Sequence, residues 1–201
     1  MLRKGEGGAI RVYVVTKNEG KAREFIELGR AFGIKIDIVR IPKIEIQSED
    51  LREIAMYSAI NALAHVRDNV MVEDAGLFID ALNGFPGPYS SYVYKKLGVK
   101  GILKLMNGVR NRRACFKSIM AFASPTGLMK VFEGVVCGRI APNARGSRGF
   151  GFDPIFIPDG ESRTFAEMSI SEKNRYSHRA KAFRNLAEWL RTAFKASDTL
   201  T

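Results

Sequence analysis

Hydrophobic and polar residues follow one another in blocks that switch between the period of a strand and that of a helix. IRVYVVT at 10–16 is a β-branched and aromatic run typical of a buried strand, and KAREFIELGRAFG after it has helical spacing and ends at a glycine. KIDIVRI at 35–41 alternates as a strand does, residues 50–67 return to helical spacing, and NVMVED at 69–74 is a short strand pattern. The first part of the chain therefore predicts alternating strands and helices.

Two long strand patterns dominate the second half, RACFKSIMAFA at 113–123 and LMKVFEGVVCGRI at 128–140. The PTG between them is a turn signal, so we expect an antiparallel hairpin. Helical patterns precede the hairpin, and a final helix over about 177–195 begins at Ser177, a suitable N-cap. Strand–helix alternation followed by a hairpin predicts an α/β protein with a mixed sheet, two lobes and a cleft between them.

Length and composition are those of one folded domain. The 201 residues are 46% hydrophobic and 26% charged, which is typical of a globular protein. We expect a single domain over 1–201, with a flexible start at 1–9 and a second lobe over roughly 77–145. No apolar run is long enough to span a membrane, and the N-terminus lacks the apolar stretch of a signal peptide, so we expect a cytoplasmic protein.

Net charge and cysteine content each leave two interpretations open. The charge of +11 fits a nucleic-acid surface or an enzyme whose substrate is a polyanion such as a nucleotide. Cys115 and Cys137 lack the spacing of a zinc site. We interpret both as unpaired apolar strand residues in a reducing cytosol. The alternative is a disulfide, since intracellular disulfides occur in some hyperthermophiles.

Candidate chemistry lies where the predicted strands end, because ligands of such sheets collect at the carboxyl ends of strands. After the first strand, Thr16, Asn18 and Lys21 offer a hydroxyl, an amide and an ammonium group beside a helix N-terminus, which suits a phosphate. Asp74 closes the strand at 69–74, next to a glycine-containing turn. Either Glu45 or Glu49 could supply a second carboxylate for Mg²⁺.

Two further stretches combine rings, flexible backbone and cationic donors. RGFGFDPIF at 148–156 has three phenylalanines, two glycines and a carboxylate, which favours a wall of a binding pocket over a plain strand or turn. In EKNRYSHRAK, Lys173, His178 and Arg179 surround one helix start and could read carbonyl oxygens of a base.

Taken together, these stretches resemble the inosine triphosphate pyrophosphatase family, whose members hydrolyse nonstandard purine nucleoside triphosphates such as ITP, dITP and XTP. The resemblance spans about 10 to 190 and implies a two-lobed α/β fold with a long central mixed sheet flanked by helices, a nucleotide-binding cleft and a homodimer. Its motifs occur in family order: TKNEGK at 16–21, VEDAGL at 72–77, GFPGPYS at 84–90, GFGFDP at 149–154, AEM at 166–168, EKN at 172–174 and SHR at 177–179.

The resemblance also implies a role for each matching residue. Asp74 corresponds to the general base, and Asp74 and Glu45 to the ligands of Mg²⁺. Phe150 is the ring we expect to stack on the base, while Phe152 and Phe156 could instead anchor the loop to the core. The substrate-binding positions are Thr16, Lys17, Asn18, Lys21, Ala75, Ser91, Phe150, Gly151, Phe152, Asp153, Lys173, His178 and Arg179.

Some positions depart from the family pattern. Some relatives have a lysine at the positions of Ser91 and near Ser58, so Lys21, a lysine at 95–96 or a partner subunit would have to meet the phosphate charge here. Lys17 replaces a small residue of many relatives, and either adds to phosphate attraction or points to solvent.

The expected reaction is Mg²⁺-dependent hydrolysis of a nonstandard purine triphosphate to the monophosphate and pyrophosphate. One alternative is a Maf-type pyrophosphatase acting on pyrimidine or modified nucleotides, against which GFGFDP and SHR argue. The other is a basic nucleic-acid-binding protein without turnover, which only the charge favours. We expect neither a membrane nor a specific nucleic acid as partner.

Overall fold

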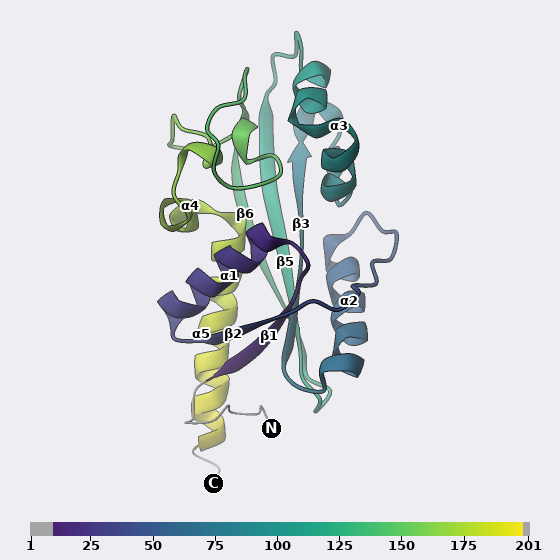
Figure 1. Cartoon of the computed structure of the whole chain (residues 1–201), viewed down its shortest axis with the longest axis vertical. Coiled ribbons are helices and arrows are strands. Elements are labelled where there is room, and N and C mark those ends of the chain that lie inside the picture. Colours follow the sequence, from purple (N-terminus) through teal and green to yellow (C-terminus); the bar gives the residue numbers. More distant parts are fainter. Residues whose placement is uncertain (1–9, 199–201) are drawn as a thin grey trace. The chain divides into compact units, whose positions relative to one another are not determined.

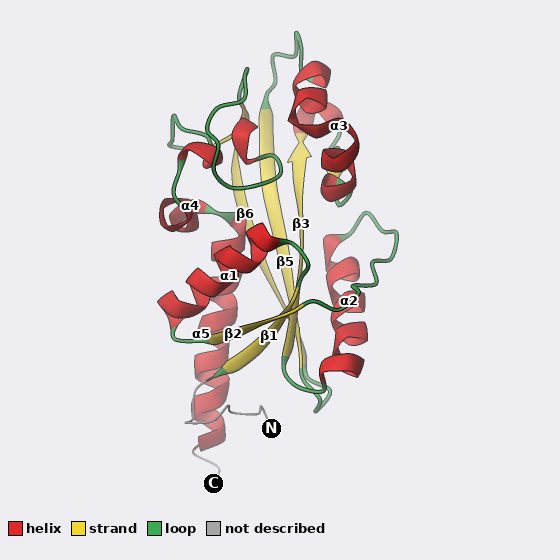
Figure 2. Cartoon of the chain, viewed as in Figure 1, coloured by secondary structure: helices red, strands yellow, loops and turns green. Residues whose placement is uncertain are grey.

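The computed structural model describes residues 10–198, so the flexible start expected at 1–9 lies outside the described residues. Strands and helices alternate and then give way to a long hairpin (Figure 2). The strands are β1 (Arg11–Val15), β2 (Lys35–Val39), β3 (Val70–Ile79), β4 (Pro86–Gly87), β5 (Arg113–Ala123), β6 (Met129–Ile140) and β7 (Phe156–Pro158). The α-helices are α1 (Glu19–Phe32), α2 (Leu51–Val66), α3 (Ser90–Leu105), α4 (Ile170–Tyr176) and α5 (His178–Asp198).

The strands form one mixed sheet over the described residues, in the order β2-β1-β3-β5-β6-β7, with β4 paired to β3. β1 is parallel to β2 and to β3, whereas β3–β4 and β6–β7 are antiparallel. β5 and β6 are neighbours joined by the predicted turn, where the N–H of Gly127 donates to the carbonyl of Ser124. The predicted α/β class, the mixed sheet and the hairpin are confirmed.

The chain divides into two compact units, each with its own hydrophobic core. Of the described residues, the first unit contains those from 10 to 74, then Ile119–Glu133, and those from 180 to 198. The second contains Ala75–Ser118 and Gly134–Arg179, so it is built from two separated segments of the chain.

In the first unit, α1 and α5 lie on one side of the sheet and α2 on the other (Figure 1). Phe25 of α1 and Phe183 of α5 pack ring against ring in a core that also contains Val12 and Val14 of β1. Gly33 ends α1 in the left-handed region, as the sequence predicts, and Asn18 caps its start. This packing fixes the turn between β1 and α1.

The strand containing Asp74 is longer than predicted. The sequence places a strand end and a turn at Asp74-Ala75-Gly76, but β3 continues to Ile79. Gly76 is needed there because a Cβ would lie 2.2 Å from the carbonyl oxygen of Gly87 on β4. The glycine therefore allows a close neighbouring strand rather than a turn, and Asp74 lies inside the strand.

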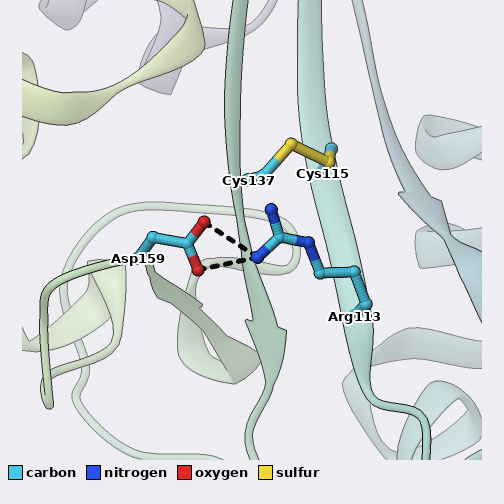
Figure 3. The surroundings of a disulfide bond; sticks show 4 residues. All are labelled: Arg113, Cys115, Cys137 and Asp159. Carbon is cyan, nitrogen blue, oxygen red and sulfur yellow. Dashed lines mark hydrogen bonds and ion pairs between the residues drawn. A yellow bond between two sulfur atoms is a disulfide. The ribbon is translucent and has the colours of Figure 1, made fainter.

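The expectation of two reduced cysteines is wrong. Cys115 of β5 and Cys137 of β6 form a disulfide, with Cα atoms 4.0 Å apart (Figure 3). Neighbouring antiparallel strands bring facing residues to such a distance, so the hairpin register places the two thiols together. The guanidinium of Arg113 also donates to both carboxylate oxygens of Asp159, at 2.8 Å each.

Candidate active site

The turn between β1 and α1 presents hydrogen-bonding groups at the start of a helix. The hydroxyl of Thr16 accepts from the N–H of Asn18 at 3.1 Å, and Oδ1 of Asn18 accepts from the N–H of Lys21 at 3.0 Å. Lys17 in the same turn is exposed. These bonds hold the turn in one conformation beside the positive end of the α1 dipole, where an anion is stabilised.

Two adjacent carboxylates of β3 each contact a lysine from another part of the first unit. Oε2 of Glu73 lies 2.7 Å from Nζ of Lys21, and Oδ1 of Asp74 lies 3.3 Å from Nζ of Lys43. Both carboxylates are buried. Successive side chains of a strand point to opposite faces, which explains why the two carboxylates have different partners.

Lys43 joins Asp74 to Glu45. Its ammonium group lies 2.8 Å from Oε1 of Glu45, while Glu45 itself is largely exposed. Of the two carboxylates left open by the sequence, Glu45 is thus the one that shares a cation with Asp74. Lys43 was missed, although alternation from Lys43 to Glu45 could have placed both on one side of the extended segment.

Charge and burial act against each other at this cluster. Burial raises the pKa of Asp74, and the positive charges of Lys43 and Lys21 only partly offset this effect. Burial alone would lower the pKa of Lys43, but the carboxylates of Asp74 and Glu45 raise it above its ordinary value. The ammonium group therefore stays charged at neutral pH.

Glu45 and Asp74 are the carboxylates of the first unit that could hold a divalent metal ion. Among residues 10–198 there is no group of three or more His, Cys, Asp or Glu side chains arranged as a metal cage. Mg²⁺ commonly takes only one or two carboxylates and completes its shell with waters and phosphates. Glu45 and Asp74 already contact one common cationic group, so their oxygens suit a divalent cation.

In the second unit, Asp153 and Lys173 form a buried ion pair next to Phe150. Nζ of Lys173 lies 2.6 Å from Oδ2 of Asp153, and the same oxygen accepts from the N–H of Phe150 at 2.9 Å. Lys173 and the buried guanidinium of Arg179 lie 4.9 Å and 5.5 Å from the centre of the Phe150 ring. Four of the predicted base-site residues are thus brought together.

Two glycines give the loop its shape. At Gly149 (φ +73°) a Cβ would lie 2.1 Å from Oδ2 of Asp153, so only a glycine lets that carboxylate reach the Phe150 N–H. Gly151 is also in the left-handed region, with φ +61°, and a Cβ built there would meet no atom within 4 Å. Gly149 is thus required by a close contact with Asp153, and Gly151 by its left-handed backbone conformation.

Other predicted base-site residues have different surroundings. Phe152 and Phe156 are both buried in the core of the second unit. The Phe152 ring packs edge-on against Tyr94, and the Phe156 ring packs edge-on against Phe116. This agrees with the anchoring role considered for Phe152 and Phe156. The His178 ring stacks on Phe116 with centroids 4.8 Å apart.

The remaining two predicted residues of the second unit lie apart from this cluster of contacts. Ser91 is exposed in the first turn of α3, and its neighbour Ser90 is the buried one, donating to the carbonyl of Gly87 and accepting from the N–H of Leu77. Ala75 is half-buried on β3, directly after Asp74. Neither position supplies a charge.

A sequence model of the Ham1 family matches residues 12–189. The chain therefore belongs to the Ham1 family. Ham1 relatives include a dITP/XTP pyrophosphatase of Hyperthermus butylicus, 51% identical over 90% of this chain and 94% of the relative. Another, from Saccharolobus solfataricus, is 49% identical over 94% of this chain and 96% of the relative. The solved structure of a Ham1 protein from Coxiella burnetii is 30% identical, with a TM-score of 0.79 over 91% of this chain and 99% of that one.

Proposed function

We propose that this Ham1 protein hydrolyses nonstandard purine nucleoside triphosphates, such as ITP, dITP and XTP, to the monophosphate and pyrophosphate. The observation that carries the proposal is the buried Asp74, which shares a cationic partner with Glu45 and is under the positive charge of Lys21. Relatives of about 50% identity named dITP/XTP pyrophosphatase support the same substrate class.

Asp74 would act as the general base. Its carboxylate accepts a proton from water as the water oxygen bonds to the α-phosphorus. The bond from that phosphorus to the bridging oxygen breaks, and the pyrophosphate leaves with its electron pair. Positioning and electrostatic stabilisation supply most of the rate gain in such reactions.

The groups of the β1–α1 turn would bind phosphate oxygens. Thr16, Asn18 and the N-terminus of α1 offer hydrogen bonds, and Lys21 offers charge. Mg²⁺, held by Glu45 and Asp74, would offset the negative charge that develops on the leaving pyrophosphate.

The second unit would bind the purine. Phe150 offers a ring face for stacking, and Arg179 offers donors for the O6 acceptor of hypoxanthine or xanthine. Adenine has a donor at that position, so it would leave buried donors unpaired. Such a mismatch lowers kcat/KM by up to roughly 10⁴-fold.

We further propose, from the family resemblance, a cytoplasmic homodimer with the nucleotide in a cleft. Within residues 10–198 no helix is long and apolar enough to cross a membrane. The basic charge then serves a nucleotide substrate rather than a nucleic acid.

The test is a panel of nucleoside triphosphates with pyrophosphate detection, run with Mg²⁺ and with EDTA. We expect pyrophosphate release from ITP, dITP and XTP, and little from ATP and pyrimidine nucleotides. With EDTA we expect no pyrophosphate from any of them. Preference for pyrimidine or modified nucleotides would favour the Maf-type alternative. Salt-sensitive binding to generic oligonucleotides without any turnover would favour the nucleic-acid alternative.

A further inference from the structure

Lys43 makes an unusual set of contacts for a lysine in an irregular segment. Its Nζ contacts Oε1 of Glu45 at 2.8 Å, Oδ1 of Asp74 at 3.3 Å and the carbonyl oxygen of Glu73 at 3.4 Å. The Lys43 side chain is only 17% exposed. Three oxygens thus surround one ammonium group, as they would surround a small cation.

The two carboxylates are the same pair that the proposed function gives to Mg²⁺. A lone buried carboxylate is costly unless a positive charge lies beside it. Asp74 is such a carboxylate, and Lys43 supplies that charge. A divalent ion held by these carboxylates would lie within a few ångströms of the Lys43 ammonium group, and the two positive charges would repel each other.

We propose that Lys43 is a tethered cation that holds Glu45 and Asp74 together in the metal-free protein and competes with the divalent ion for these carboxylates. The inference rests on the proposed metal role of Glu45 and Asp74. Binding of the ion displaces the ammonium group from both carboxylates. In the metal-free protein, Lys43 thereby balances the negative charge of the Asp74 carboxylate. The same contact weakens the affinity of the site for the metal ion.

The competition is tested with Mn²⁺ alone, by calorimetry and by electron paramagnetic resonance of the free ion. Lys43→Met removes the charge and keeps most of the side-chain volume. We expect it to bind Mn²⁺ at least about tenfold more tightly than the wild type, a change equivalent to ~1.4 kcal/mol. Lys43→Arg, which keeps the charge, and Lys35→Met, an exposed lysine of β2 in the same unit, should stay within about twofold of the wild type.

A second measurement needs no variant and so does not depend on the fold of Lys43→Met. Wild-type protein is reductively methylated with and without saturating Mg²⁺, and each lysine is followed by mass spectrometry. Displacement predicts that the ion raises the methylation rate of Lys43 several-fold and leaves that of Lys35 unchanged. An equal rate at Lys43 in both conditions would overturn the inference.

The outcomes separate this inference from the proposed function. Wild-type Mn²⁺ binding that Lys43→Met leaves unchanged or weakens would overturn the role of Lys43 alone. If the wild type binds no Mn²⁺ and releases no pyrophosphate from ITP, the metal role and the inference fall together.

Discussion

The ammonium group of Lys173 on α4 lies 2.6 Å from Oδ2 of Asp153, and both side chains are almost completely buried. The same oxygen accepts from the N–H of Phe150. One carboxylate therefore connects α4 to the loop that presents the Phe150 ring. Asp153 therefore positions Phe150 and Lys173, and its own side chain is almost completely buried.

Lys173→Met should leave the Asp153 carboxylate buried without this partner. Removing one member of a buried ion pair typically destabilises a protein by about 3 kcal/mol or more. The double variant Lys173→Met with Asp153→Asn should recover part of this loss, because it removes the uncompensated charge. Urea denaturation measures the free energy of unfolding of the two variants and of the wild type. A double variant that is no more stable than Lys173→Met would contradict the ion pair.

Much of the fold and half of the candidate site were predictable from local patterns. Asn18 and Gly33 mark the two ends of α1 by cap chemistry that acts within a few residues, and the PTG turn marks the hairpin. The turn at 16–21, for which we propose phosphate binding, is likewise local. Its geometry follows from a strand end, a cap and a helix.

What the sequence did not reveal depends on residues far apart in the chain. β3 continues past Asp74 and pairs with β4, where Gly76 lies close to the carbonyl oxygen of Gly87, and a local pattern cannot show this contact. The disulfide needs the register of β5 on β6. Lys43 becomes informative only once β3 brings Asp74 beside it.

Arg179→Ala should mainly reduce the preference for ITP over ATP. The buried guanidinium near Phe150 is the group we assign to the O6 acceptor. The ratio of kcat/KM for the two substrates is the right measurement, because it does not depend on the fraction of folded enzyme. We expect the ratio to fall at least about tenfold, and an unchanged ratio would show that other groups read the base.

Loss of the disulfide should destabilise the second unit. Cys115 and Cys137 are 22 residues apart, and closing a loop of that size contributes about 3 kcal/mol. Cys115→Ser should unfold at lower urea than the oxidised wild type, and a reducing agent should remove most of the difference. Alkylation of two thiols in the unreduced, denatured wild type would contradict the bond.

Glu172→Gln should flatten the acid dependence of stability. Two hydrogen bonds lower the pKa of Glu172 to about 2. The bond from the Arg163 side chain has the larger effect, and the bond from the backbone N–H of Ser169 has the next largest. A lowered pKa means that the stabilisation is present above the ordinary value of 4.5 and is lost as the pH falls from there to about 2. Urea midpoints at pH 6 and pH 3 should therefore differ more in the wild type than in Glu172→Gln.

The most direct test of the central claim is the product balance with ITP, measured for the wild type and for Asp74→Asn. The wild type should form IMP and pyrophosphate in equal amounts, with no IDP. Asp74→Asn should keep the circular dichroism spectrum of the wild type and lose at least about 10²-fold in rate. Formation of IDP and phosphate, or near-normal turnover by Asp74→Asn, would contradict it.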